Sequence, residues 1–204
     1  MKARLCLFEP VERPSEMHTA NRCWVFCANK RAERVLASAA NEGDVAFGTG
    51  AIANSDVTGV NAGAVAIGLS SVANNNAGAG NNSVAIGRQA IATSTSATGS
   101  SPTAIGAFAD ATGAGSQVAI GDSASASGTD AIAIGGHAFA AGVSASGNQS
   151  TAIGQSSVAS AQSAIAIGNG STASGSESIA IGTGNLVSGN NSGAIGDPNT
   201  ITGS

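Results

Sequence analysis

The sequence predicts an all-β fold, a parallel β-roll or solenoid of about ten short repeats. Three observations carry this prediction: a tripeptide that recurs at regular spacing, an alternation of Ala with Val or Ile around it, and a composition rich in Gly, Ala, Ser and Asn. Only 10% of the 204 residues are charged and 3% are aromatic. An ordinary domain has about 25% charged residues, so we expect neither a typical enzyme core nor a basic nucleic-acid-binding surface.

The recurring tripeptide is Ala-(Ile/Phe)-Gly. The shortest interval between successive copies is 14 residues, which defines the length of the repeat. It ends at Gly48, Gly68, Gly87, Gly106, Gly121, Gly135, Gly154, Gly168, Gly182 and Gly196. Three longer spacings, which end at Gly87, Gly106 and Gly154, fit this repeat with a five-residue insertion. We place the insertions at Asn74–Gly78, Thr93–Ala97 and Ala141–Ala145, at one register point, and therefore predict loops along one edge of a regular stack. The spacing from Gly48 to Gly68 contains an insertion that we leave unplaced.

Each repeat predicts two short strands. In the second, such as Ser83–Gly87 or Asp130–Gly135, apolar side chains alternate with Ala, the period of a β-strand. Both of its faces are apolar or small, so we expect both to be covered. The first strand places small residues such as Ala124 and Ala126 on one face, which indicates close backbone approach there. So many Gly and β-branched residues disfavour a helix.

A coil of this length has a thin interior, because two strands of about five residues cannot enclose bulky side chains. Ala and one or two Ile per coil bury little apolar area. At about 25 cal/mol per Å² this burial hardly offsets the entropy of ordering the backbone. Stacking of repeats and association between chains are therefore expected.

The composition changes near Asn41–Asp44. Residues 44–204 keep one basic residue, Arg88, against seven acidic residues, whereas residues 1–43 hold the remaining seven basic ones. We expect residues 1–43 to be a non-repeat leader, disordered or partly helical and foreign to the repeat domain. Residues 44–204 are expected to be that domain, truncated at its C-terminus. We identify neither a secretory signal nor a membrane anchor, and expect no direct membrane insertion of this chain.

The repeats resemble those of a known family. Asn82-Ser83-Val84-Ala85-Ile86-Gly87, the 14-residue period and the small-residue half-repeat are similar to the head repeats of trimeric autotransporter adhesins, the YadA-like heads. The resemblance covers about residues 44–204. It implies a left-handed β-roll that assembles as a homotrimer on the outer membrane of a Gram-negative bacterium. It also implies attachment to a host matrix protein such as collagen, to host cells or to other bacteria, without catalysis.

Two sets of residues are candidates for binding. By the resemblance, the ligand-binding candidates are Ser83, Val84, Ala85, Ile86 and Gly87, although the same alternation is what strand packing requires, and we favour packing. A second set lies at the fourth repeat position, opposite the small Ala face. An apolar stripe there would serve trimer contact, which we favour, or a ligand; its members are Val72, Ile91, Phe139, Val158 and Leu186. The insertions are an alternative ligand surface.

Other functions receive little support. Cys23 and Cys27 have the spacing of one zinc-ligand pair, but Cys6 and His18 do not form a second pair, so we predict neither a metal nor another cofactor. The residues form no pattern for nucleophilic catalysis, and we predict that the chain is not an enzyme. A monomeric, ice-binding-like solenoid remains an alternative but requires a regular Thr-x-Thr ladder. A structural protein like a phage tail fibre is a further alternative.

Overall fold

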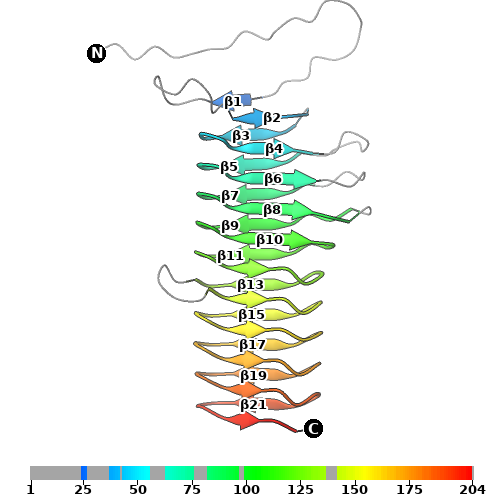
Figure 1. Cartoon of the computed structure of the whole chain (residues 1–204), viewed down its shortest axis with the longest axis vertical. Coiled ribbons are helices and arrows are strands. Elements are labelled where there is room, and N and C mark those ends of the chain that lie inside the picture. The colour runs from blue at the N-terminus through cyan, green and yellow to red at the C-terminus, as the bar shows by residue number, and fades with distance from the viewer. Residues whose placement is uncertain are drawn as a thin grey trace, which may run out of the picture.

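The computed structural model describes residues 24–26, 37–41, 43–55, 63–75, 82–96, 99–136 and 142–203. Within these ranges the chain winds into a rod of stacked coils, two short strands to a coil, and forms no helix (Figure 1). The predicted all-β parallel solenoid is confirmed. Its left-handedness and its trimeric state stay predictions.

The strands form two parallel sheets that run the length of the rod. One sheet contains the odd-numbered strands: β1 (Trp24–Phe26), β3 (Val45–Phe47), β5 (Val65–Ile67), β7 (Val84–Ile86), β9 (Thr103–Ile105), β11 (Val118–Ile120), β13 (Ile132–Ile134), β15 (Thr151–Ile153), β17 (Ile165–Ile167), β19 (Ile179–Ile181) and β21 (Gly193–Ile195). The other contains the even-numbered strands: β2 (Ser38–Ala39), β4 (Ile52–Asn54), β6 (Val72–Asn75), β8 (Ile91–Ser94), β10 (Asp110–Gly113), β12 (Ser125–Ala126), β14 (Ser144–Ala145), β16 (Val158–Ala159), β18 (Thr172–Ala173), β20 (Leu186–Val187) and β22 (Thr200–Ile201).

In the odd-numbered sheet most residues pair with like residues, and in the even-numbered sheet the inward Ala residues do so. Ala119 of β11, for example, lies in register between Ala104 of β9 and Ala133 of β13. Because side chains alternate between the two faces of a strand, this register sends every central Ala inward and every flanking Val, Ile or Thr outward. A shift by one residue would place the large side chains inside, so the repeat itself fixes the register.

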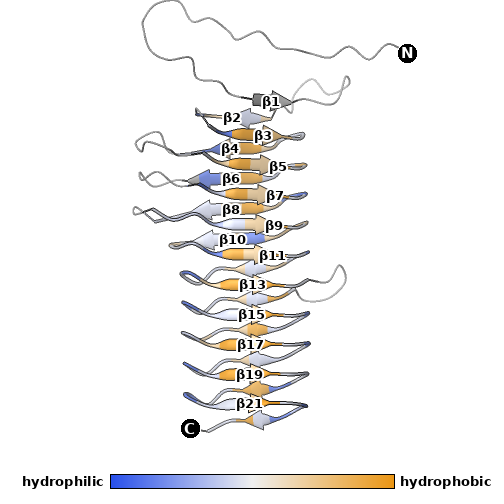
Figure 2. Ribbon diagram, turned by 180° about the vertical axis from the view of Figure 1, so that it is seen from behind, coloured by the Kyte–Doolittle hydropathy of each residue, from blue (hydrophilic) through white to orange (hydrophobic). Residues whose placement is uncertain are grey.

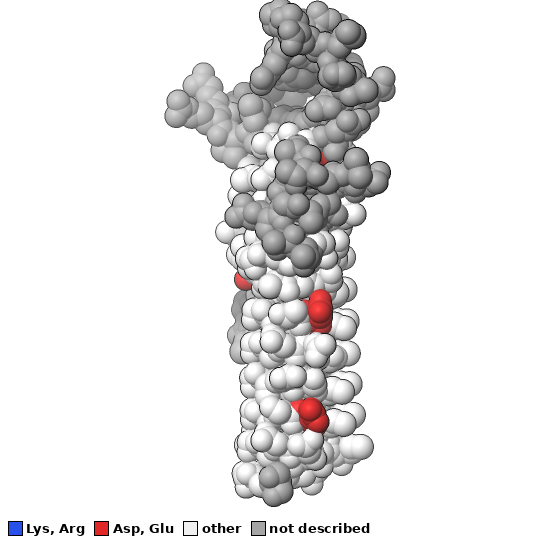
Figure 3. All heavy atoms as spheres, turned by 90° about the vertical axis from the view of Figure 1, so that its right-hand side faces the viewer, with Lys and Arg blue, Asp and Glu red and all other residues white. Residues whose placement is uncertain are grey.

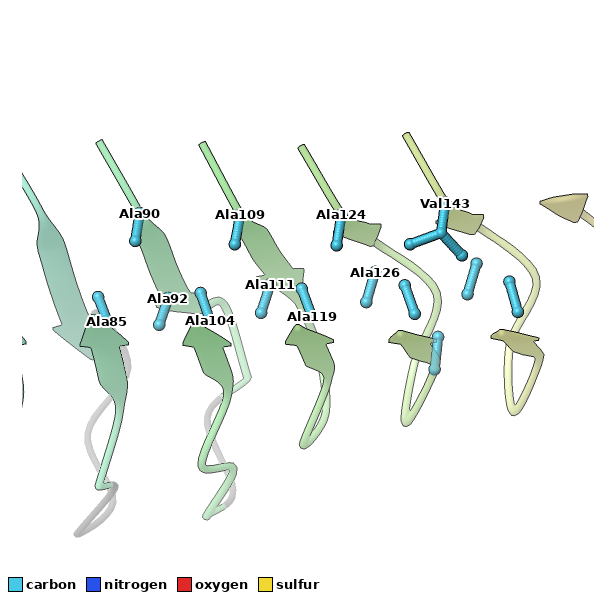
Figure 4. Packing of buried hydrophobic residues seen from close by; sticks show 14 of the residues in the cluster. Ala85, Ala90, Ala92, Ala104, Ala109, Ala111, Ala119, Ala124, Ala126 and Val143 are labelled. Carbon is cyan, nitrogen blue, oxygen red and sulfur yellow. The ribbon is translucent and has the colours of Figure 1, made fainter. Parts of the chain in front are cut away.

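The interior between the sheets is narrow and consists mainly of Ala methyl groups. Figure 4 shows Ala85, Ala104 and Ala119 of the odd-numbered strands facing Ala92 and Ala111 of the even-numbered strands, all wholly buried. The expected thin core is therefore observed. Other fully buried positions hold Ser, and a few larger side chains such as Val143 and Val187 occur among them.

The interior also holds polar side chains. Two of them, Asn185 and Gln117, differ in whether their amide groups are hydrogen-bonded. Asn185 is satisfied, since its Nδ2 donates to the carbonyls of Ile181 and Gly196 at 2.8 and 2.7 Å. Gln117 is wholly buried, and neither its amide nitrogen nor its amide oxygen has a hydrogen-bond partner among the described residues. Its coil is therefore less stable than a coil with Ser or Ala at this position.

Two of the predicted insertions lie on the predicted edge, but their bounds were wrong. Asn74 and Asn75 still pair with Thr93 and Ser94 as strand residues, so the added residues of both coils follow these pairs. The unplaced insertion has the same location, between the end of β4 at Asn54 and the start of β5 at Val65. In the chain, all three follow even-numbered strands.

The third predicted insertion, Ala141–Ala145, was wrong. Ser144 and Ala145 form β14 and pair with Ser125 and Ala126, so they belong to the regular repeat. The added residues therefore come before Val143, between β13 and β14. The sequence misled because small residues fill both turns, so that two alignments of this repeat are nearly equivalent.

Two strands lie upstream of the expected domain boundary. β1 pairs with β3, and β2 pairs with β4 in register, so both sheets begin before residue 44. Asp44 is buried, and its carboxylate accepts hydrogen bonds from the backbone N–H groups of Asn41, Ser55 and Ala64 at 2.8–3.1 Å. This side chain therefore ties neighbouring coils together at the expected boundary. That residues 1–43 form a separate leader stays a prediction.

Gly168 and Gly170 lie in one turn but differ in the space around them. A Cβ on Gly168, at φ +120°, would lie 1.9 Å from the carbonyl oxygen of Gly182 in the next coil, whereas one on Gly170, at φ +66°, would meet nothing within 4 Å. Gly168→Ala should therefore lower the free energy of unfolding by about 3 kcal/mol. Gly170→Ala should cost about 1 kcal/mol. Urea denaturation measures both, and equal losses would contradict the close stacking of coils.

Candidate binding surfaces

The hexapeptide at β7 divides into inward and outward residues. Ser83 and Ala85 are wholly buried, and the Ser83 hydroxyl has no hydrogen-bond partner among the described residues. A Cβ on Gly87 would lie 2.2 Å from the carbonyl oxygen of Gly106. Val84 and Ile86 point outward and are half-buried. Ser83, Ala85 and Gly87 therefore serve packing, and of the five carried-over residues Val84 and Ile86 have side chains that reach the surface.

The outer face of the odd-numbered sheet is an apolar ladder. Each strand contributes its first and third residues to this face, and these are mainly Val and Ile. Examples are Val118 and Ile120 of β11, Ile132 and Ile134 of β13, and Ile165 and Ile167 of β17. Several members are exposed in the single chain: Phe47 by 46%, Ile105 by 37% and Ile179 by 38%. In Figure 2 the odd-numbered strands carry most of the hydrophobic colour. We call this surface the odd-strand face.

The predicted apolar stripe lies on the outer face of the even-numbered sheet, and it is interrupted. Val72 and Ile91 are neighbours, but Asp110, Ser125 and Ser144 follow them in register before Val158. Thr172 then separates Val158 from Leu186. Phe139 lies outside the described residues, and Ser144 occupies the corresponding place in the ladder. The assignment of this stripe to trimer contact stays a prediction.

One surface feature was not found from the sequence. It lies on the turns that follow the odd-numbered strands, where Arg88, after β7, places its guanidinium carbon 4.3 Å from the centre of the Phe108 ring, after β9. Leu69 occupies the equivalent turn after β5 and is 50% exposed, and Phe108 is 42% exposed. We call Leu69, Arg88 and Phe108 the turn patch. The sequence gives no direct signal of this contact, because Arg88 is the first residue after Gly87 whereas Phe108 is the second after Gly106.

The rest of the described surface carries little charge. Figure 3 shows a few acidic side chains and no Lys or Arg on the edge that faces the viewer. The described residues contain no group of three or more His, Cys, Asp and Glu that could hold a metal ion. Cys6, His18, Cys23 and Cys27 lie outside them. No described helix is long and apolar enough to cross a membrane.

A stack of two-stranded parallel coils with an Ala interior and an apolar outer ladder defines a repeat solenoid built for surface contact. Comparison with protein families shows which solenoid this is: the YadA head domain repeat matches residues 60–90, 79–100, 118–138, 145–171 and 173–197, together more than half of the chain. The chain belongs to the YadA head domain family. Searches of curated proteins and of solved structures give no match. Membership implies a cell-surface adhesin, and the family is in general non-catalytic.

The packing role of Ser83 and Ala85, the buried residues of the hexapeptide, can be tested with one substitution at each position. Ser83→Ala removes a buried hydroxyl that has no partner among the described residues, so the free energy of unfolding should stay within about 0.5 kcal/mol of the wild type. Ala85→Leu overfills the narrow interior and should cost about 1–3 kcal/mol. Urea denaturation followed by circular dichroism measures both. A large loss for Ser83→Ala would show that Ser83 has an interaction absent from the described structure.

Proposed function

We propose that the chain is the head of a trimeric autotransporter adhesin that is displayed on a bacterial outer membrane. In this proposal the head attaches the bacterium to a host matrix protein such as collagen, to host cells or to other bacteria, and it catalyses no reaction. Membership in the YadA head domain family supports the role. Three copies would place their rods side by side, with the remaining surfaces free for a ligand.

The odd-strand face is the observation that carries the proposal. Soluble monomers rarely expose a continuous apolar patch of more than a few hundred Å², and this ladder extends over successive coils from Val45 to Ile195. Burial of Val and Ile against other copies would also supply the apolar contact that the narrow Ala interior lacks. The odd-strand face therefore fits trimer contact better than the interrupted stripe that contains Val72, Ile91, Val158 and Leu186.

The alternatives fit this surface less well. A monomeric solenoid that binds ice by a Thr ladder would present Thr in successive coils, whereas the odd-strand face presents Val and Ile with Thr103 and Thr151 as isolated exceptions. A protein like a phage tail fibre would share a trimeric β-structure. The match to the YadA head domain repeat favours the adhesin.

The trimer contact can be tested with paired surface substitutions. Ile134→Asp together with Ile167→Asp places two charges on the odd-strand face and should convert the trimer into a folded monomer, because a buried unpaired charge is costly. Ser125→Asp together with Thr172→Asp, on the opposite outer face, should leave the mass of the assembly unchanged. Sedimentation measures the masses. A β-rich wild type with the mass of a single chain would contradict the trimer.

Attachment can be tested with the same variants. The wild-type chain should bind immobilised collagen or host cells, or should make bacteria that display it aggregate. The variant with Ile134→Asp and Ile167→Asp should bind at least about tenfold more weakly, because it loses the avidity of three linked sites. Surface plasmon resonance and a settling assay measure these effects. Absence of binding to collagen and cells, together with absence of aggregation, would contradict the adhesive role.

A further inference from the structure

We propose that the turn patch, Leu69, Arg88 and Phe108, binds an extended proline-rich polypeptide in the polyproline II conformation that carries a carboxylate side chain. The inference rests on the proposed function, because it assigns a site and a chemistry to the attachment of the head to a matrix protein. None of the three residues is among those that the sequence marks as candidate ligand contacts.

The first argument concerns charge. Arg88 is the only basic residue in residues 44–204, which contain seven acidic residues. Its guanidinium lies over the Phe108 ring, and no carboxylate or carbonyl oxygen among the described residues pairs with it. An Arg side chain held on an aromatic ring loses less rotamer freedom when it binds a carboxylate, and its N–H groups can bind that carboxylate in a bidentate manner. This guanidinium, the only basic group of residues 44–204 and held on an aromatic ring, is therefore suited to an acidic group on a ligand.

The second argument concerns Phe108. It adopts φ +57°, a left-handed conformation that is unfavourable for a bulky residue. The residues at the equivalent position in other turns are small or polar, including Ser70, Gln89 and Ser123. The Phe108 ring is 42% exposed, so packing in the single chain does not account for an aromatic residue here. Other turns of the roll share this backbone conformation, so it is the exposed ring that distinguishes this turn as a candidate contact.

The third argument concerns spacing along the rod. The turns stack directly, since the N–H of Gln89 donates to the carbonyl of Leu69 and the N–H of Phe108 donates to that of Arg88, at 2.8 and 2.9 Å. Leu69 is the first residue after Gly68 and Phe108 is the second after Gly106, so they lie in adjacent columns of the turns, and the rise along the rod between their coils is about 9.6 Å. One turn of polyproline II is three residues of about 3.1 Å each, or about 9.3 Å. A polyproline II segment parallel to the rod would thus set residues i and i+3 against Leu69 and Phe108.

Leu69 and Phe108, the apolar residues of the turn patch, distinguish between an acidic saccharide and an acidic polypeptide as the ligand. An acidic saccharide would satisfy Arg88 but would leave Leu69, which is 50% exposed, without an apolar partner. In the polypeptide, proline rings at positions i and i+3 cover Leu69 and Phe108, and an acidic residue between them reaches Arg88. Aromatic side chains bind polyproline II segments in this manner, at low entropic cost to the ligand.

The test uses the full chain and two synthetic probes, a peptide of repeating Pro-Pro-Glu triplets and its Pro-Pro-Gln counterpart. The wild type should bind the Glu peptide at least about tenfold more tightly than the Gln peptide, as expected for a charge pair worth about 1.4 kcal/mol. Arg88→Gln should abolish this discrimination. Phe108→Ser should weaken both complexes at least about fivefold. Gln155→Ala, at the turn position of Arg88 in a distant coil, is the control and should change neither.

The substitutions keep residues that the roll already accepts, because Gln155 and Ser123 occupy the turn positions of Arg88 and Phe108. Loss of fold is therefore not expected, and circular dichroism checks it.

The site is overturned if the wild type does not distinguish the two peptides, or if an acidic polysaccharide competes and the Glu peptide does not. A changed sedimentation mass of Arg88→Gln would identify the patch as a contact between copies and would also overturn it. Equal binding of wild type, Arg88→Gln and Phe108→Ser to collagen refutes the site alone, whereas failure of the wild type to attach to any host surface refutes the proposed function.

Discussion

The stacking of backbone on backbone at the spacing of a parallel sheet is the constraint on which the rest of this molecule depends. Two strands of two to four residues leave room for little more than a methyl group between them, so Ala occupies most of the inward strand positions. The same closeness demands Gly where one turn meets the next, as at Gly121, where a Cβ would lie 2.2 Å from the carbonyl oxygen of Gly135. The Ala- and Gly-rich composition, the 14-residue period and the register of the strands all follow from the distance between stacked coils.

A narrow interior directs the larger side chains outward. Val and Ile of the odd-numbered strands have no space inside, and they form instead the ladder on the odd-strand face. An apolar surface of this length requires a partner, and identical copies can supply one by symmetry. Apart from their Gly positions, the turns carry exposed side chains such as Leu69 and Phe108. This is where the chain can vary its chemistry, as Arg88 and Phe108 illustrate.

Much of the fold could be predicted from the sequence because the repeat encodes it directly. The 14-residue period, the two strands per coil and the inward Ala all follow from alternation and from the recurrence of Gly. The placement of Ala141–Ala145 could not be predicted, since small residues fit either turn of that coil and only the pairing of Ala145 with Ala126 decides between them. The turn patch was also missed. Arg88 and Phe108 lie in successive repeats, and their contact requires the stacking of turns in three dimensions.

The direction of the hydrogen bonds has a mechanical consequence. Bonds within both sheets, such as those from Ile132 to Ser150 and from Ser144 to Ser157, join one coil to the next and therefore lie along the rod. When flow pulls an attached cell, tension applied to the ends of a single chain loads the coils in series, and the weakest coil, such as the one with the unsatisfied Gln117, would yield first. In the proposed trimer, contacts between copies along the odd-strand face would lie parallel to this series of coils and would share the load over the whole length. Association through that face would then determine the force that the rod withstands as well as its equilibrium stability.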